Sequence, residues 1–445
     1  MAHSVDASPQ ASGDLRRDLT LLDSIMINVG SMIGSAIFIV PALIALTLQS
    51  GGLVLSVWVI GGIVSLFGAL AIAELGGMMP HAGGQYIFLS KIYGPVWGFL
   101  YGWAAFTVII SGSISAIAVA FATYLGYFFP LDESSIKIVA IASIILLTLV
   151  NCFGIKFGAI LQNGLTFIKI CSLLLLVFLS FWLSDGSSGT VTRILSSPSQ
   201  VIPLSGVVAA MVAVLWAYDG WIEITFVAGE VRQPERTIHR SLIISTFMVI
   251  GLYVLVNAAY LSVLPVEAMA QSLLVASDTM KAILGAPGAS IIAAAVIIST
   301  FGANNGFVIT GARIYYAMAK ERMFFPSFAQ VHARFATPIP SLLGQGLWAS
   351  VLVLSGTYEQ LFTYVVFASW IFYALSNAGV LILRKRNPDA PRPYRTWGYP
   401  VTPIVFIVFA MALVVVSIVE NPRDSLVGLA MILSGLPAYW YWKRK

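Results

Sequence analysis

The chain is a series of long apolar runs separated by short polar segments. Runs of about 18–25 apolar residues are long enough to cross about 30 Å of hydrocarbon as α-helices. The pattern therefore predicts an all-α integral membrane protein with twelve transmembrane helices, of which the ninth is short. The predicted spans are 20–48, 53–77, 96–128, 136–154, 159–183, 204–230, 239–264, 289–318, 340–355, 359–383, 400–419 and 424–442.

Two of these spans are interrupted by glycines and small polar residues. The first break lies within Ile25–Phe38, around Gly30-Ser31 and Gly34-Ser35, and the second lies within Val214–Glu230, around Asp219-Gly220. Lipid offers no hydrogen-bond partner, so unpaired backbone at mid-membrane is tolerated only where it is buried in protein or lines a cavity. A matching pair of broken spans indicates the binding site of a secondary transporter.

The spacing of the two breaks predicts an inverted repeat. They lie about 186 residues apart, and each opens a block of five spans. Because five is odd, the second block enters the membrane from the opposite side. We expect one transporter domain over residues 19–445, with repeats at about 20–183 and 204–383 and two further helices at about 400–442. Residues 1–18 are expected to be a disordered cytoplasmic tail.

Composition and charge support a membrane protein and give its orientation. Apolar residues make up 59% and charged residues 10% of the chain, and the mean hydropathy is +0.91. If the N-terminus is cytoplasmic, eighteen of the 24 Lys and Arg residues lie inside, as the positive-inside rule requires. The chain then resides in the cytoplasmic membrane with both termini inside. Its basic character reflects this topology, and we expect no nucleic-acid partner.

The sequence lacks the residues of an enzyme or a metal site. The two cysteines, Cys152 and Cys171, lie in or beside apolar spans, and neither belongs to a cluster of metal-ligating residues in the sequence. The four histidines lie in the tail or in loops. We therefore expect no catalytic residues, no bound metal and no cofactor.

The breaks supply complementary seats for an α-amino acid. Where a half-helix restarts after the first break, free amides and the positive end of the helix dipole favour a carboxylate. Carbonyls before that break and around the second break form acceptors for an ammonium group. The carboxylate candidates are Gly34, Ser35, Ala36 and Ile37, and the ammonium candidates are Asn28, Val29, Met32, Trp216, Ala217 and Asp219. The alternative is that the glycines only allow close helix packing.

Four separated motifs resemble the amino acid–polyamine–organocation superfamily. They are Gly34-Ser35-Ala36-Ile37-Phe38, Pro80–Tyr86, Phe226–Arg240 and Asn387–Arg395, in the order in which the superfamily has them. Within it the chain is most similar to bacterial members of the L-type amino acid transporter family, which are sodium-independent exchangers. The resemblance implies the five-plus-five inverted repeat of the bacterial leucine transporter, with discontinuous helices 1 and 6.

The resemblance also assigns roles to two residues. Trp216 aligns with the aromatic residue that covers the substrate, so it is the expected gate. Lys169, in the fifth span, resembles a built-in replacement for the sodium ion of sodium-coupled relatives, donating to carbonyls at the first break and to the hydroxyls of Ser299 and Thr300. The alternative is that the Lys169 side chain snorkels to the cytoplasmic surface. The distance of about 15 Å from Lys169 to the cytoplasmic end of its span is too long for that reach. A buried ammonium within a span is a functional candidate by default.

The remaining pocket candidates leave alternatives open. Asp219 either caps a second half-helix or contacts the substrate or a proton. Asn304 either lines the pocket or joins helices. Ala36 stands where the family usually has a second glycine, and Ile222 where eukaryotic members have asparagine. Both departures favour small or medium neutral amino acids over charged ones.

The sequence thus predicts a sodium-independent amino acid exchanger that works by alternating access. The alternative is a proton-coupled permease for amino acids, or one that takes up polyamines or cationic amino acids. Eukaryotic L-type members pair with a glycoprotein through a cysteine between helices 3 and 4. The corresponding segment, residues 129–135, has none, so we expect no disulfide-linked heavy chain.

Overall fold

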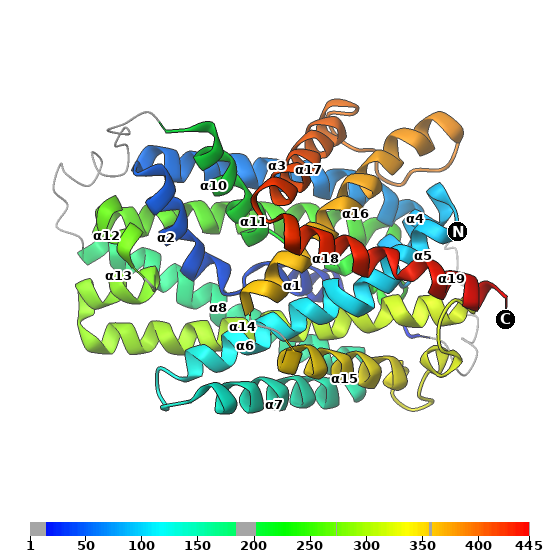
Figure 1. Cartoon of the computed structure of the whole chain (residues 1–445), viewed down its shortest axis with the longest axis horizontal. Coiled ribbons are helices and arrows are strands. Elements are labelled where there is room, and N and C mark those ends of the chain that lie inside the picture. The colour runs from blue at the N-terminus through cyan, green and yellow to red at the C-terminus, as the bar shows by residue number, and fades with distance from the viewer. Residues whose placement is uncertain (1–14, 184–201, 273, 356–357, 445) are drawn as a thin grey trace, which may run out of the picture.

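The computed structural model describes residues 15–183, 202–272, 274–355 and 358–444, and its long elements are all helices (Figure 1). Within this part of the chain, eight helices are long and apolar enough to cross a membrane, and one further pair forms a broken span. The eight are α3 (Gly51–Met78), Pro95–Leu125, α7 (Glu133–Cys152), α8 (Ile155–Leu183), α11 (Pro234–Val263), α14 (Ala286–Lys320), Tyr364–Arg386 in α16 (Tyr358–Arg386) and α17 (Val401–Glu420). The third predicted span thus contains α5 (Pro95–Ala104), a π-helical turn (Ala105–Ile109) and α6 (Ile110–Leu125).

The broken pair is the first predicted span. Its two halves, α1 (Leu21–Met32) and α2 (Ala36–Leu48), meet at an angle of 42°. A capping box begins α1, because the Thr20 hydroxyl accepts from the amide of Asp23 while the Asp23 carboxylate accepts from the amide of Thr20. The helix ends where the amide of Gly34 bonds to the carbonyl of Met32 instead of continuing the helical pattern.

The sixth predicted span differs from a simple broken helix. It begins as α10 (Leu204–Ala217) and continues after the break as two 3₁₀ turns, Glu223–Thr225 and Ala228–Glu230, where we expected a half-helix. Gly220 at the break has a φ of 102°, a conformation that glycine adopts without penalty. A Cβ there would lie 3.0 Å from the backbone nitrogen of Met32. The two breaks therefore touch, backbone to backbone.

Neither the ninth nor the twelfth predicted span forms a single helix long enough to cross a membrane. The ninth corresponds to α15 (Ile339–Ser355), and the twelfth is divided into α18 (Pro422–Leu433) and α19 (Gly435–Lys443). Short helices occupy several connections. Figure 1 shows α4 and α19 at one end of the molecule and α12 and α13 at the opposite end. These connecting helices are α4 (Gln85–Tyr93), α12 (Val266–Gln271), α13 (Val275–Leu284) and the 3₁₀ turn Pro326–Ala329.

The segment before α1 packs against the connection that follows the second break. Leu19 donates to the carbonyl of Glu230 and accepts from the amide of Arg232, both at 2.9 Å. Leu15 is buried as well. The carbonyl of Arg17 also accepts from the Arg232 side chain at 3.3 Å. Residues 15–18 are therefore packed against this connection, whereas residues 1–14 lie outside the described part of the chain, where the expected disorder stays a prediction.

Candidate functional site

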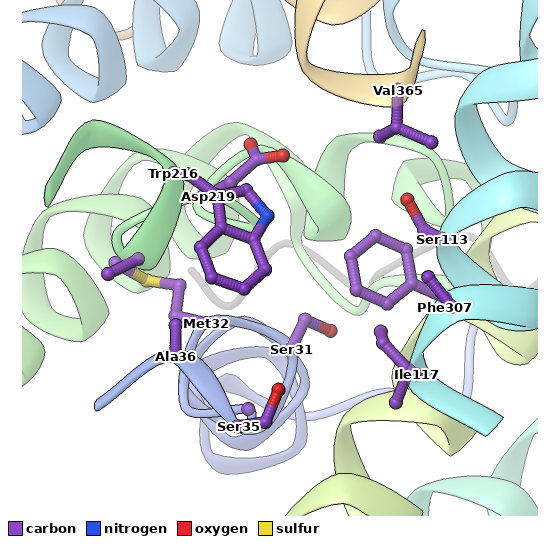
Figure 2. A pocket seen from close by; sticks show the side chains of 13 residues that line it. Ser31, Met32, Ser35, Ala36, Ser113, Ile117, Trp216, Asp219, Phe307 and Val365 are labelled. Carbon is purple, nitrogen blue, oxygen red and sulfur yellow. The ribbon is translucent and has the colours of Figure 1, made fainter. Parts of the chain in front are cut away.

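A cavity of about 60 Å³ lies where the two breaks meet. Figure 2 shows Trp216 and Asp219 on one side of it, Ser113, Ile117 and Phe307 across from them, and Ser31 and Ser35 from the first break. Its walls come from α1, α2, α6, α10, α14 and α16. The lining residues are Ser31, Met32, Gly34, Ser35, Ala36, Ser113, Ala116, Ile117, Trp216, Ala217, Asp219, Phe307 and Val365.

The start of α2 presents unpaired amides at this cavity. In the described part of the chain, no protein group accepts from the amides of Ser35, Ala36 or Ile37. Gly34, Ser35 and Ala36 line the cavity, as the carboxylate seat requires, whereas the side chain of Ile37 is fully buried elsewhere. Free amides at the N-terminus of a 13-residue helix are suited to an anion.

Part of the predicted ammonium seat is already occupied by the protein. The carbonyl of Met32 accepts from the Tyr253 hydroxyl at 2.8 Å, and the carbonyl of Val29 accepts from the amide of Ile33. The Asn28 side chain accepts from the amide of Ile224 at 2.9 Å and donates to Ser245. Placing Asn28 and Val29 in the pocket is therefore wrong for this structure, because both serve helix structure and packing.

From the second break, Trp216, Ala217 and Asp219 line the cavity. The carbonyl of Trp216 accepts from the amide of Asp219 at 2.9 Å, so the acceptor that this break presents with a side chain is the carboxylate of Asp219. The Asp219 carboxylate accepts from the Tyr373 hydroxyl of α16 at 2.7 Å. It does not cap a helix, since Ile222 precedes the first 3₁₀ turn and makes no side-chain cap. The structure thus favours the pocket alternative for Asp219.

Lys169 lies behind the first break with its ammonium fully engaged. Its Nζ donates to the carbonyls of Gly30 at 2.9 Å, Ile33 at 2.7 Å and Ser299 at 3.0 Å. The contact with Ser299 is through the carbonyl, while the Ser299 hydroxyl donates to Ile33. Thr300 does not join this group, because its hydroxyl bonds within α14 to Val296 and Ile297. Lys169 is buried and does not snorkel.

Two further candidates do not reach the cavity, and six residues of the lining were missed. Ile222 is buried in the turn after the second break, and Asn304 is buried in α14 without lining the cavity. Ser31 was recognisable, because it lies between the glycines of the first motif. The others depend on which faces of α6, α14 and α16 turn inward. The missed residues are Ser31, Ser113, Ala116, Ile117, Phe307 and Val365.

Buried ion pairs lie at the end of the molecule where the backbone of Leu19 bonds to Glu230 and Arg232, a pairing that we call the Leu19 bridge. Arg313 of α14 bonds to Glu230 through Nε at 2.7 Å and Nη2 at 3.1 Å, and both side chains are buried. Glu74 of α3 accepts from Arg384 and Arg392. These contacts give Arg313 and Glu74 a structural role in joining segments.

Comparison with known proteins identifies the family. The sequence model described as Amino acid permease matches residues 19–440. The chain is 32% identical to the human large neutral amino acids transporter small subunit 2, over 99% of this chain and 84% of that protein. It is 28% identical to the serine/threonine exchanger SteT of Bacillus subtilis, over 97% and 98%, and 30% identical to the human cystine/glutamate transporter, over 98% and 88%. The chain therefore belongs to the amino acid permease family of the amino acid–polyamine–organocation superfamily, among its L-type transporters.

Proposed function

We propose that this membrane protein is a sodium-independent exchanger of small or medium neutral L-amino acids. The observation that carries the proposal is the cavity between the two helix breaks, with free amides on one wall and the Asp219 carboxylate on another. An α-amino acid carries a carboxylate beside an ammonium, so its two charged groups match these two walls. Among the relatives, the Bacillus protein SteT is a serine/threonine exchanger.

The size of the cavity supports the smaller substrates. The cavity has a volume of about 60 Å³, and a single buried water needs at least about 10–15 Å³. A space of this size favours short side chains, such as those of alanine or serine. The walls opposite the carboxylate seat combine the Ser113 hydroxyl with the apolar Ile117, Phe307 and Val365. Such a wall accommodates a short neutral side chain and gives no acidic partner to a long cationic one.

Lys169 accounts for the proposed independence of sodium. A cation bound behind the first break would neutralise the negative ends of the backbone dipoles there. The Lys169 ammonium already occupies that position, with three carbonyls as ligands. A fixed ammonium removes the need for a transported metal ion, so the substrate would move without sodium.

The proposed topology has twelve transmembrane segments in a five-plus-five inverted repeat. Broken elements at the start of each repeat support it. We propose that the end carrying the Leu19 bridge faces the cytoplasm together with both termini, because most Lys and Arg residues then lie inside. Cys152 and Cys171 are free and lie outside the segment between helices 3 and 4, so the proposal includes no disulfide-linked heavy chain.

Alternating access follows from the position of the substrate. A ligand bound across both breaks lowers the free energy of the state in which the two touch, and can shift the balance between outward and inward forms. The empty carrier would then reorient slowly, which couples uptake of one amino acid to release of another. The indole of Trp216 borders the cavity (Figure 2) and would close it on one side.

Reconstitution in sodium-free liposomes tests the proposal. Labelled serine, alanine, leucine, arginine and putrescine would be offered to empty vesicles and to vesicles preloaded with unlabelled amino acids. We expect uptake of serine and alanine only into preloaded vesicles. Uptake into empty vesicles that increases with an inward proton gradient would instead establish a proton-coupled permease, and preference for arginine or putrescine would overturn the substrate class.

A further inference from the structure

A second acid, Glu223, is buried below the cavity and has no role in the proposed exchange. It follows Asp219 by four residues, in the first 3₁₀ turn after the second break. Only 1% of its surface is exposed. Its carboxyl contacts the Thr310 hydroxyl of α14, one turn after Phe307 in the cavity wall. Glu223 therefore lies just beyond the cavity, toward the end where Glu230 and Arg313 pair.

The Thr310 hydroxyl lies close to more than one acceptor. A threonine hydroxyl has one proton, yet the Thr310 hydroxyl oxygen lies within hydrogen-bond distance of both the Glu223 carboxyl and the carbonyl of Gly306, the latter at 3.0 Å. A threonine in a helix ordinarily donates to the carbonyl four residues earlier. If Thr310 does so here, its contact with Glu223 needs a proton from the carboxyl. A protonated Glu223 satisfies both bonds, whereas an ionised one leaves one of them unmade.

No cation neutralises Glu223 among the described residues. Arg313 is the basic residue one turn further along α14. Its guanidinium donates to Glu230 and, at 2.8 Å, to the carbonyl of Ile309. Lys169 is held by the carbonyls of the first break. A buried carboxylate without a cation is expensive, and more so within a membrane.

The other titratable groups around Glu223 bring no positive charge. Asp219 is a second acid, and Tyr101, Tyr315 and Tyr373 are phenols of α5, α14 and α16, of which Tyr315 donates to the carbonyl of Ala105 and Tyr373 donates to Asp219. On α1, the uncharged Asn28 accepts from the amide of Ile224, next to Glu223, and donates to the hydroxyl of Ser245 on α11. The charged groups of those two helices lie at their ends: Asp23 bonds to Lys156, and His239 bonds to the carbonyl of Glu235 and stacks on Tyr394.

We propose that Glu223 is a proton-binding site, whose carboxyl carries a proton and donates it to the Thr310 hydroxyl in the conformation seen here. Opening the end where Glu230 and Arg313 pair would expose Glu223 to water and release that proton. Closure of this end of the carrier would then require protonation of Glu223. The proton is bound and released without any covalent step, and Lys169 and the substrate contacts remain as they are.

Infrared spectroscopy of the purified full-length protein tests this proposal without requiring transport. A protonated carboxyl absorbs apart from a carboxylate, so we expect a band at neutral pH that is absent in Glu223→Gln and present in Asp219→Asn. In Thr310→Val the band should shift, because the carboxyl loses its acceptor. A band that survives Glu223→Gln, that disappears in Asp219→Asn instead, or that Thr310→Val leaves unmoved would overturn the proposal.

Exchange in liposomes supplies the second readout. We expect the rate of wild-type exchange to fall several-fold as the pH on the side of Glu230 is raised from neutral to alkaline. Glu223→Gln, a permanently neutral mimic, should retain exchange and lose that fall, and an unchanged pH profile in this variant would contradict the proposal. If the wild-type protein exchanges none of the amino acids offered, the proposed function fails, whereas the infrared result still decides the proton site.

Discussion

At the scale of single residues, the site combines groups that the protein satisfies itself with groups that it leaves open. Lys169, Tyr253 and Ser299 bond to carbonyls of the first break. The amides of Ser35 and Ala36 have no protein acceptor in the part of the chain that the structure describes. Unmade hydrogen bonds in a buried place cost free energy, so a ligand that makes them gains that free energy on binding.

Ser31 provides the most direct test of the pocket. Its hydroxyl is buried, lines the cavity and has no hydrogen-bond partner among the described residues. Ser31→Ala should therefore leave the thermal stability unchanged while raising the KM for exchange about 3- to 10-fold, the equivalent of one hydrogen bond of about 0.5–1.5 kcal/mol. Radiolabel exchange and a thermal melt measure the two quantities. An unchanged KM would remove Ser31 from the substrate contacts.

Lys169 should be essential for exchange. The carbonyl of Gly30 has lost its helical partner, because the amide of Gly34 bonds to Met32, and Lys169 replaces that partner. Lys169→Met leaves the buried carbonyl of Gly30 unpaired at about 1–3 kcal/mol, while the carbonyl of Ile33 keeps the Ser299 hydroxyl, so we expect exchange to fall about 10- to 100-fold. Lys137→Met is the control, because Lys137 pairs with the exposed Glu133 on the surface. This variant should exchange amino acids at the normal rate. Normal exchange by Lys169→Met, still without sodium, would contradict the assigned role.

At the scale of elements, the contact between the two breaks decides the geometry of the site. Gly220 brings the second break against the backbone of Ser31 and Met32. The helices on either side are ordinary apolar helices, and each could form without the other. Their ends define a pocket only because they are held together, with Tyr253 of α11 bonded to Met32 and Tyr373 of α16 bonded to Asp219.

Substituting Gly220 should separate the breaks. In Gly220→Ala the new Cβ would lie 3.0 Å from the backbone of the first break, at a φ of 102° that alanine rarely adopts. We expect a lower melting temperature and a loss of exchange of at least about 10-fold. Gly251→Ala is the matched control, since a Cβ in α11 at that position meets nothing within 4 Å and alanine favours the helix. Equal behaviour of the two variants would show that the contact between the breaks is dispensable.

At the scale of the whole molecule, one end is closed by contacts between segments distant in sequence. The Leu19 bridge joins the segment before α1 to the residues after the second break. Arg313 of α14 forms an ion pair with Glu230 in the same region. Tyr86 of α4 donates to Glu321 beyond α14 at 2.6 Å. Opening this end for substrate release therefore requires several contacts to break together, and the cavity lies behind them.

The Arg313–Glu230 pair should behave as a coupled unit. Arg313→Met leaves Glu230 as an uncompensated buried charge, which costs about 3–5 kcal/mol, and should lower the melting temperature clearly. The double variant Arg313→Met with Glu230→Met removes both charges and should recover much of the loss. Thermal unfolding of the single and double variants in detergent measures the coupling. Simple addition of the two single effects would show that the residues act independently.

The sequence determined the class of protein, the two breaks and the lysine behind the first of them. Apolar length, glycine placement and a charge within a span are local properties, so Gly34, Ser35, Ala36, Trp216, Asp219 and Lys169 could be selected without coordinates. The twelve-span repeat and the membrane orientation derived in the same way stay predictions.

Only the tertiary structure decided which groups face the cavity. Asn28, Val29 and Ile222 are close in sequence to residues that line it, yet none of the three lines it. Ser113 and Phe307 enter the wall from helices far away in sequence. The side of a helix that faces a pocket depends on its rotation and on its neighbours. In an apolar span, where nearly every side of the helix is hydrophobic, no amphipathic pattern records that rotation.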